Sequence, residues 1–173
     1  VKGLCSCRGV PGRLEVLPTE TPYTVIRDYA HSPDGLEKVL STLKEFAPAR
    51  VVTLFGCAGN RDRSKRPVMG EIVSRLADFA ILTSDNPRDE DPQRILDDCL
   101  PGILKHKTPH KVILDRYDAI NWALDNCKPD DILILCGKGD EDYQVLDFGT
   151  IYFDEREIVL GLLAGKREVV SEG

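Results

Sequence analysis

The sequence contains no apolar run near the ~20 residues that a membrane-spanning helix needs, and nothing at its amino terminus resembles a signal peptide. Basic residues are also in the minority, with 23 Lys and Arg against 29 Asp and Glu, for a net charge of −6. This balance argues against a footprint for nucleic acid or for an anionic membrane surface. We therefore expect no nucleic-acid or membrane partner.

The six cysteines do not form a metal-binding pattern. Cys5 and Cys7 lie close together but lack a second pair and partnering histidines, so we expect neither a zinc site nor another metal site. The other four lie in or beside apolar runs and are interpreted as small core residues: Cys57, Cys99, Cys127 and Cys136. This usage indicates a reducing compartment, the cytoplasm.

Short apolar strands alternate with amphipathic helical patterns along most of the chain. The 173 residues, 42% hydrophobic and 30% charged, suffice for one domain with a full core. The expected strands are residues 24–26, 51–55, 79–82, 111–114 and 132–136, and the expected helices are 36–46, 68–76, 95–103, 118–127 and 154–164. Strands separated by such helices predict an α/β fold, Rossmann-like and doubly wound, with a mainly parallel sheet.

The two ends of the chain read differently from this alternation. Residues 1–22 are turn-rich and are interpreted as the end of a preceding domain and a linker. Residues 23–165 form the predicted domain, and residues 166–173 are expected to be a frayed tail.

The loop after the third predicted strand carries both signs of charge and an amide within four residues. Asp85, Asn86 and Arg88 surround Pro87, which restricts the backbone between them. Carboxylates can hold an ammonium and a guanidinium can hold a carboxylate bidentately, so the loop suits a zwitterion. From spacing alone, a structural interpretation stays open, in which Asp85 or Asn86 turns the chain and Asp91 caps the next helix.

Three other loops at strand ends carry unusual polar residues. The glycine-rich segment 56–67 holds several basic residues but is no phosphate loop, and it also fits a solvated basic turn. The Gly-Lys-Gly at 137–139 could cradle an anion or could be a common turn. His31 beside Asp28 allows acid–base chemistry, although packing or hydrogen bonding is the commoner use of such a histidine. In a doubly wound sheet all these loops lie along one edge.

Taken together, these motifs resemble the Mur ligases, and the resemblance covers Val10 to about Gly165. The motifs occur in family order and spacing: Asp-Tyr-Ala-His-Ser-Pro at 28–33, Gly-Cys-Ala-Gly-Asn-Arg-Asp at 56–62, Lys-Arg-Pro-Val-Met at 65–69, Asp-Asn-Pro-Arg at 85–88, and Gly-Lys-Gly at 137–139 with Glu-Asp-Tyr-Gln at 141–144.

The resemblance implies the carboxy-terminal domain of an ATP-dependent amide ligase of peptidoglycan precursor synthesis. In this family ATP activates the γ-carboxylate of UDP-N-acetylmuramoyl-L-alanyl-D-glutamate as an acyl phosphate, which an incoming amine attacks. Amino-terminal and central domains bind ATP, Mg²⁺ and the nucleotide sugar. We therefore expect those domains as partners, no catalytic residue in this chain, and no activity from the chain alone.

The resemblance also assigns roles to individual residues. Asp85, Asn86, Pro87 and Arg88 match the amino-acid recognition motif, whose arginine form resembles the version for meso-diaminopimelate. Further matches to the amino-acid site are Arg61, which would hold a carboxylate, and Gly137 and Glu141, which would bind the distal end. Matches near ATP are Arg13, Asp28 and, more weakly, His31. Asp140 departs from the family pattern, where many relatives have histidine.

Other functions remain possible from the sequence. An L-lysine-adding ligase or a folylpolyglutamate-synthetase-like ligase would share the architecture, but the latter has no evident need for the 85–88 loop. A stand-alone nucleotide-binding α/β module would bind nucleotide and show no amino-acid preference. A pure interaction domain is disfavoured, because the unusual polar residues cluster at strand ends.

Overall fold

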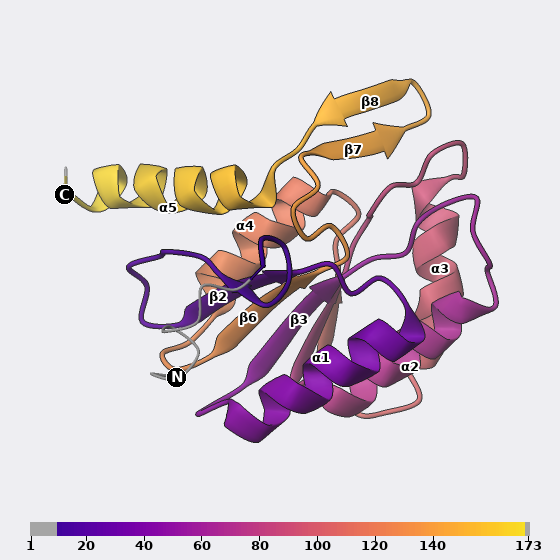
Figure 1. The fold of residues 1–173 in the computed structure, drawn as a ribbon, viewed down its shortest axis with the longest axis horizontal. Coiled ribbons are helices and arrows are strands. Elements are labelled where there is room, and N and C mark those ends of the chain that lie inside the picture. Colours follow the sequence, from indigo (N-terminus) through magenta and orange to yellow (C-terminus); the bar gives the residue numbers. More distant parts are fainter. Residues whose placement is uncertain (1–9, 172–173) are drawn as a thin grey trace.

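The fold has three layers, with a six-stranded sheet between two sets of helices (Figure 1). A computed structural model describes residues 10–171, and side chains through residue 166, so Cys5 and Cys7 lie outside the described residues. The strand order is β1-β2-β6-β3-β4-β5, with β1 (Glu15–Val16), β2 (Thr24–Asp28), β3 (Val51–Phe55), β4 (Phe79–Leu82), β5 (His110–Val112) and β6 (Ile132–Cys136). Strands β2 to β6 run parallel, and β1 pairs antiparallel with β2. The predicted α/β fold with a mainly parallel sheet is confirmed.

Helices cover both faces of the sheet. One face carries α1 (Pro33–Phe46), α2 (Lys65–Leu76) and α3 (Pro92–Ile103), and the other carries α4 (Arg116–Asn126) and α5 (Glu155–Ser171) (Figure 1). The chain steps from β2 through β3 and β4 to β5, then returns through α4 to β6, which lies between β2 and β3. Right-handed crossovers place helices on opposite faces when the direction of travel reverses.

The elements begin where local chemistry favours them. The α1 helix follows Ser32, whose hydroxyl accepts from the Gly35 amide, and Pro33 occupies its first turn. Asp91 caps α3 in the same way, because its carboxylate accepts a hydrogen bond from the Gln93 amide. The prediction that Asp91 caps this helix is confirmed. The central strands β3 and β6 are buried along their whole length, which accounts for their continuous apolar sequences.

Both ends of the domain extend beyond the predicted elements. At the amino end, β1 joins the sheet and Leu17 is buried in the core, so the sheet begins inside the segment interpreted as a linker. At the carboxyl end, α5 continues to Ser171, past residue 166, where the tail was predicted to begin. The ammonium of Lys166 pairs with Asp125 of α4 at 2.7 Å and ties this part of α5 to the neighbouring helix.

A hairpin that the sequence did not predict follows β6. It consists of β7 (Tyr143–Leu146) and β8 (Gly149–Tyr152), joined by a two-residue turn, and it projects beyond the carboxyl edge of the sheet (Figure 1). The turn residues Asp147 and Phe148 are not the Asn-Gly or Asp-Gly pair that marks such hairpins in a sequence. Over residues 10–171, no helix combines the length and the apolar character needed to cross a membrane.

Candidate functional site

The loops that follow β2, β3, β4 and β6 meet at the carboxyl edge of the sheet and enclose a cavity of about 520 Å³. The cavity is lined by the residues predicted for the amino acid, apart from Pro87: Arg61, Asp85, Asn86, Arg88, Gly137 and Glu141. Pro87, in the same loop as Asn86 and Arg88, is buried. Parallel strands bring these segments together, although they lie up to 80 residues apart in sequence, from 61 to 141.

A second cavity of about 460 Å³ adjoins the first and shares Tyr29, His31 and Ser32 with it. It holds the residues predicted to lie near ATP, Arg13, Asp28 and His31. The structure therefore groups the predicted residues into two neighbouring sets, with His31 lining both cavities.

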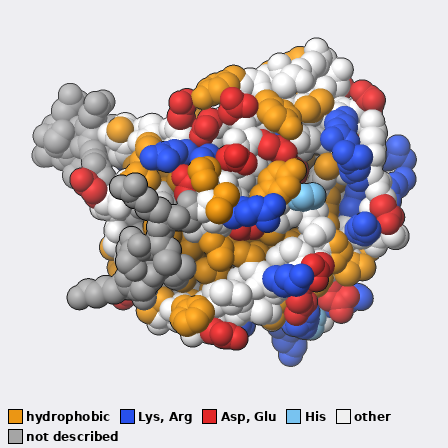
Figure 2. All heavy atoms as spheres, viewed as in Figure 1, with side chains coloured by type: hydrophobic (Ala, Val, Ile, Leu, Met, Phe, Trp, Pro, Cys, Tyr) orange, Lys and Arg blue, Asp and Glu red, His pale blue; other side chains and the backbone are white. Residues whose placement is uncertain are grey.

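The first cavity offers charges of both signs. Arg61, Lys65 and Arg88 contribute cations, and Figure 2 shows Lys and Arg side chains gathered along the right side of this face, beside the loops that precede α2 and α3. Over residues 10–166, the Arg61 side chain is exposed and makes no hydrogen bond or ion pair. The carboxylates of Asp85 and Glu141 supply the opposite charge. This combination can hold a zwitterion.

Asp85 has an unsatisfied carboxylate oxygen. The residue is 5% exposed, and its Oδ1 has no hydrogen-bond partner among the described residues. The nearest cation is the Lys138 ammonium, whose Nζ lies 3.5 Å from that oxygen. Buried carboxylate oxygens are almost always hydrogen-bonded, and here the buried Lys138 ammonium is the group that compensates the charge of this atom.

Lys138 lies inside the protein and not in the solvent. It is fully buried, and its Nζ donates to Asn86 Oδ1 at 3.0 Å and to the Tyr143 carbonyl at 2.7 Å. Burial lowers the pKa of this ammonium, and the nearby Asp85 carboxylate opposes that shift. The ammonium therefore takes no part in the anion cradle that the sequence suggested for residues 137–139. The backbone of Gly137 adopts φ +119°, and a Cβ there would lie 3.1 Å from Asp85 Oδ2.

The loops before α2 and α3 pack backbone against backbone. The Gly59 amide donates to the Asn86 carbonyl at 2.8 Å, and Arg88 Nη1 donates to the Gly59 carbonyl at 3.3 Å. Arg88 has φ +55°, unusual for a residue with a side chain, and its amide donates to the Val145 carbonyl at 3.0 Å. Backbone strain of this kind costs about 1–3 kcal/mol and is typical of functional sites.

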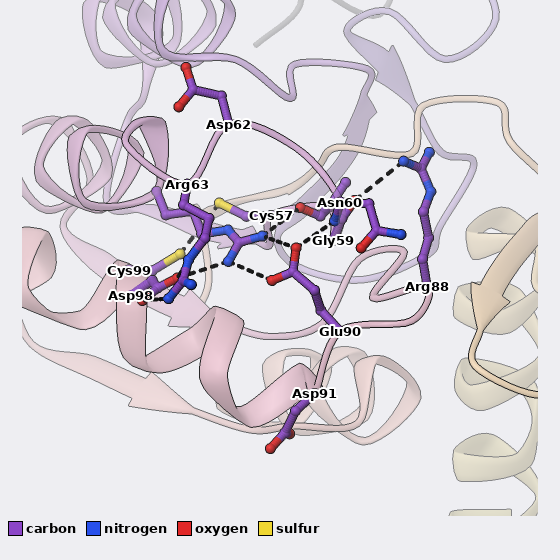
Figure 3. A network of polar contacts seen from close by, with 12 residues as sticks. Cys57, Gly59, Asn60, Asp62, Arg63, Arg88, Glu90, Asp91, Asp98 and Cys99 are labelled. Carbon is purple, nitrogen blue, oxygen red and sulfur yellow. Dashed lines mark hydrogen bonds and ion pairs between the residues drawn. The ribbon is translucent and has the colours of Figure 1, made fainter.

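A network of ion pairs braces the outer side of the same loops (Figure 3). Arg66 is 1% exposed and pairs with Glu90 at 2.9 Å and with Asp98 at 2.8 Å. Glu90 Oε1 also accepts from the Asn60 amide at 2.6 Å. The hydrogen bond from Arg66 lowers the pKa of Glu90. The interpretation of 56–67 as a solvated basic turn is thus wrong for Arg66, whose charge is used inside the protein.

A second buried pair was not found from the sequence. Arg116 and Glu155 are both fully buried and lie 2.8 Å apart. Arg116 also donates to the Ser84 carbonyl at 3.1 Å and to the Cys136 carbonyl at 2.9 Å, at the ends of β4 and β6. No local pattern marks either residue, because the partners lie 39 positions apart on two different helices.

The residues of the second cavity are partly engaged in structural contacts. The Asp28 carboxylate accepts from the amides of Leu14 and Ala30, each at 2.8 Å. His31 is exposed, and its Nδ1 lies 2.7 Å from the Tyr29 carbonyl. Arg13 lies over the Tyr29 ring, 5.9 Å from its centroid. In the part of the chain that the structure describes, no group of three or more His, Cys, Asp or Glu is placed to hold a metal.

Comparisons with known proteins agree with this arrangement. A sequence model of the Mur ligase family, described as the glutamate ligase domain, matches residues 12–139. The chain is 50% identical over 160 residues to UDP-N-acetylmuramoyl-L-alanyl-D-glutamate–2,6-diaminopimelate ligase 1 of Clostridium acetobutylicum, covering 91% of this chain and 33% of that protein. The corresponding ligase of Clostridium tetani is 47% identical over 173 residues, covering 99% of this chain and 34% of the relative.

A solved structure of such a diaminopimelate ligase superposes with a TM-score of 0.86 at 37% identity, over 93% of this chain and 33% of that one. The chain thus spans about a third of the length of the relatives it matches. The family match covers more than half of the chain. Of the four loops that form the cavity, it includes three in full and the beginning of the fourth. The chain therefore belongs to the Mur ligase family, as a glutamate ligase domain.

Proposed function

We propose that this chain is the amino-acid-binding domain of an ATP-dependent ligase that adds meso-diaminopimelate to UDP-N-acetylmuramoyl-L-alanyl-D-glutamate during peptidoglycan precursor synthesis. The observation that carries the proposal is the first cavity, which is lined both by the carboxylates of Asp85 and Glu141 and by the guanidinium groups of Arg61 and Arg88. The names and the 47–50% identity of the relatives support the same function.

The charges fit one end of diaminopimelate, which carries an ammonium and a carboxylate. In this proposal Asp85 and Glu141 hold the ammonium, and Arg88 and Arg61 hold the carboxylate by charge-assisted hydrogen bonds; all four line the same cavity. L-Lysine lacks that second carboxylate, so Arg88 supplies the discrimination. With this end bound, the amine at the other end is held for reaction, and such positioning can contribute several kcal/mol to catalysis.

The chain itself contributes little to binding ATP and Mg²⁺ in this proposal. When bound, ATP with Mg²⁺ would activate the acceptor carboxylate as an acyl phosphate. In the second cavity, Arg13 and His31 are exposed and fit the edge of a nucleotide, whereas the Asp28 carboxylate already accepts two backbone amides. We propose that domains outside these residues bind the phosphates and the metal. The isolated chain is therefore inactive in this proposal.

We also place the ligase in the cytoplasm. Cys57 and Cys99 are unpaired although their sulfurs lie 3.4 Å apart, which fits a reducing compartment.

Steady-state kinetics of the full-length ligase test the proposed function. The kcat/KM for meso-diaminopimelate should exceed that for L-lysine by at least about tenfold, the usual minimum worth of a charge-assisted contact. The isolated 173-residue chain should neither hydrolyse ATP nor form product. A preference for lysine would favour the lysine-adding alternative, and turnover by the isolated chain would contradict the division of labour between domains.

A further inference from the structure

The side-chain amide of Asn86 can adopt only one orientation. Its Oδ1 accepts from Lys138 Nζ at 3.0 Å and from the Val145 amide at 3.0 Å. An ammonium and a backbone N–H are donors only, so the amide nitrogen of Asn86 cannot take the place of its oxygen. The nitrogen Nδ2 is therefore directed to the other side, where it lies 3.4 Å from Glu141 Oε2 at the cavity.

Lys138 provides the stronger of these two constraints. Its ammonium has three protons, and its close acceptors are Asn86 Oδ1 and the Tyr143 carbonyl. Two carboxylate oxygens lie farther away, Asp85 Oδ1 at 3.5 Å and Glu141 Oε2 at 3.8 Å. The residue is fully buried, which a lysine tolerates only when it is paired and hydrogen-bonded. Its contacts link the end of β6, the start of β7 and the loop after β4.

We propose that Lys138 is a positioning residue that fixes the Asn86 amide with its nitrogen toward the cavity, so that Asn86 serves the ligand as a hydrogen-bond donor to a carboxylate. The inference rests on the proposed function, since the carboxylate is that of the distal end of diaminopimelate. Asn86 then acts beside Arg88, and the ligand ammonium is directed to Asp85 and Glu141. Lys138 thereby determines which side of the cavity accepts the ligand carboxylate and which accepts the ligand ammonium, although it does not line the cavity itself.

The substitution Asn86→Asp in the full-length ligase tests the orientation directly. It keeps an oxygen for Lys138 and Val145 but replaces the cavity-facing NH₂ group with a negatively charged oxygen. The KM for meso-diaminopimelate should rise by at least about tenfold, because a donor to a carboxylate becomes a repelling charge, while the KM for ATP stays unchanged. A KM for diaminopimelate within about twofold of wild type would show that the oxygen of Asn86 faces the ligand, and would overturn the inference.

A double-mutant cycle tests whether Lys138 acts through Asn86. Lys138→Met and Asn86→Ala should each raise the KM for diaminopimelate with little change in kcat. The double variant should raise it by clearly less than the product of the two single effects, since neighbours acting as a unit are not additive. Independent, multiplicative effects would contradict the positioning role. If Lys138→Met does not fold, as judged by circular dichroism, the Asn86→Asp result decides alone.

Two matched controls use exposed residues away from the cavity. Lys111→Met and Asn126→Asp repeat the same chemical changes on β5 and at the end of α4, and they should leave both KM values within about twofold of wild type. Measurements on the wild-type enzyme distinguish the proposed function from the role of Lys138. A wild-type enzyme that does not prefer diaminopimelate to lysine would refute the proposed function. A wild-type enzyme with this preference, together with an Asn86→Asp variant whose KM for diaminopimelate is unchanged, would refute only the role of Lys138.

Discussion

Replacing Gly59 with alanine should force the two binding loops apart. A Cβ at this position would lie 1.8 Å from the Pro87 carbonyl oxygen and 2.7 Å from its carbon. Since contacts under 3.0 Å are essentially never seen, the backbones must separate by at least about 1.2 Å, the difference between 3.0 and 1.8 Å. Both sides of the contact are backbone, so no side chain can rotate away to relieve it.

The expected loss of stability follows from two effects. Overpacking of this kind costs about 1–3 kcal/mol, and loss of the hydrogen bond from the Gly59 amide to the Asn86 carbonyl adds about 1 kcal/mol. Together they predict that the free energy of unfolding falls by about 2–4 kcal/mol. Separation of the loops also moves Arg61 away from Arg88, so the full-length ligase should show a raised KM for diaminopimelate.

Urea unfolding of the 173-residue chain, followed by circular dichroism, measures the loss. The control is Gly161→Ala in α5, where an added Cβ meets no atom within 4 Å. That change should stabilise the protein by up to about 1 kcal/mol, because alanine has the higher helix propensity. A Gly59→Ala variant within about 0.5 kcal/mol of wild type would refute the steric argument, and so would equal destabilisation by both substitutions.

Two further predictions concern buried groups on the other face of the sheet. Arg116→Met should lower the free energy of unfolding by about 3–5 kcal/mol, because it leaves the Glu155 carboxylate buried without its partner. In urea unfolding, the double variant Arg116→Met with Glu155→Leu should recover part of this loss. A double variant no more stable than Arg116→Met would contradict the proposed cause. Burial raises the pKa of Tyr23 from 10.0 to about 12, and its hydroxyl donates to the Leu124 carbonyl at 2.7 Å. The folded state thus holds the proton to higher pH than the unfolded state, so stability on the order of 2–3 kcal/mol that is present below pH 10 is lost as the pH rises to about 12. Tyr23→Phe should flatten this alkaline loss, and an unchanged pH profile would exclude Tyr23 as its source.

The grouping of the site could be predicted because it follows from connectivity. Strands joined by helices run parallel, so the loops that carry Arg61, Arg88 and Gly137 must end at one edge of the sheet. The caps of the helices were also readable, as Asp91 shows, because a cap depends on residues two or three positions away.

The buried cations could not be predicted, because their partners are distant in sequence. Arg66 lies 24 residues from Glu90, and Lys138 lies 52 residues from Asn86. Charged side chains are mostly exposed, so a lysine between two glycines reads as a solvent-facing group until its acceptors are known. The roles of the site residues toward the amino acid and ATP stay predictions, since they depend on ligands and domains beyond these residues.

The most direct test of the central claim is the ratio of kcat/KM for meso-diaminopimelate to that for L-lysine, in wild-type full-length ligase and in Arg88→Ala. A bidentate, charge-assisted contact is worth about 1.5–3 kcal/mol, so the ratio should fall by about tenfold to over a hundredfold, mainly through a raised KM for diaminopimelate. Arg88→Lys should recover only part of it, because an ammonium lacks the planar fork. If instead Arg88 serves only to hold its own loop against the Gly59 carbonyl, both amino acids will suffer equally. An unchanged ratio would contradict the account.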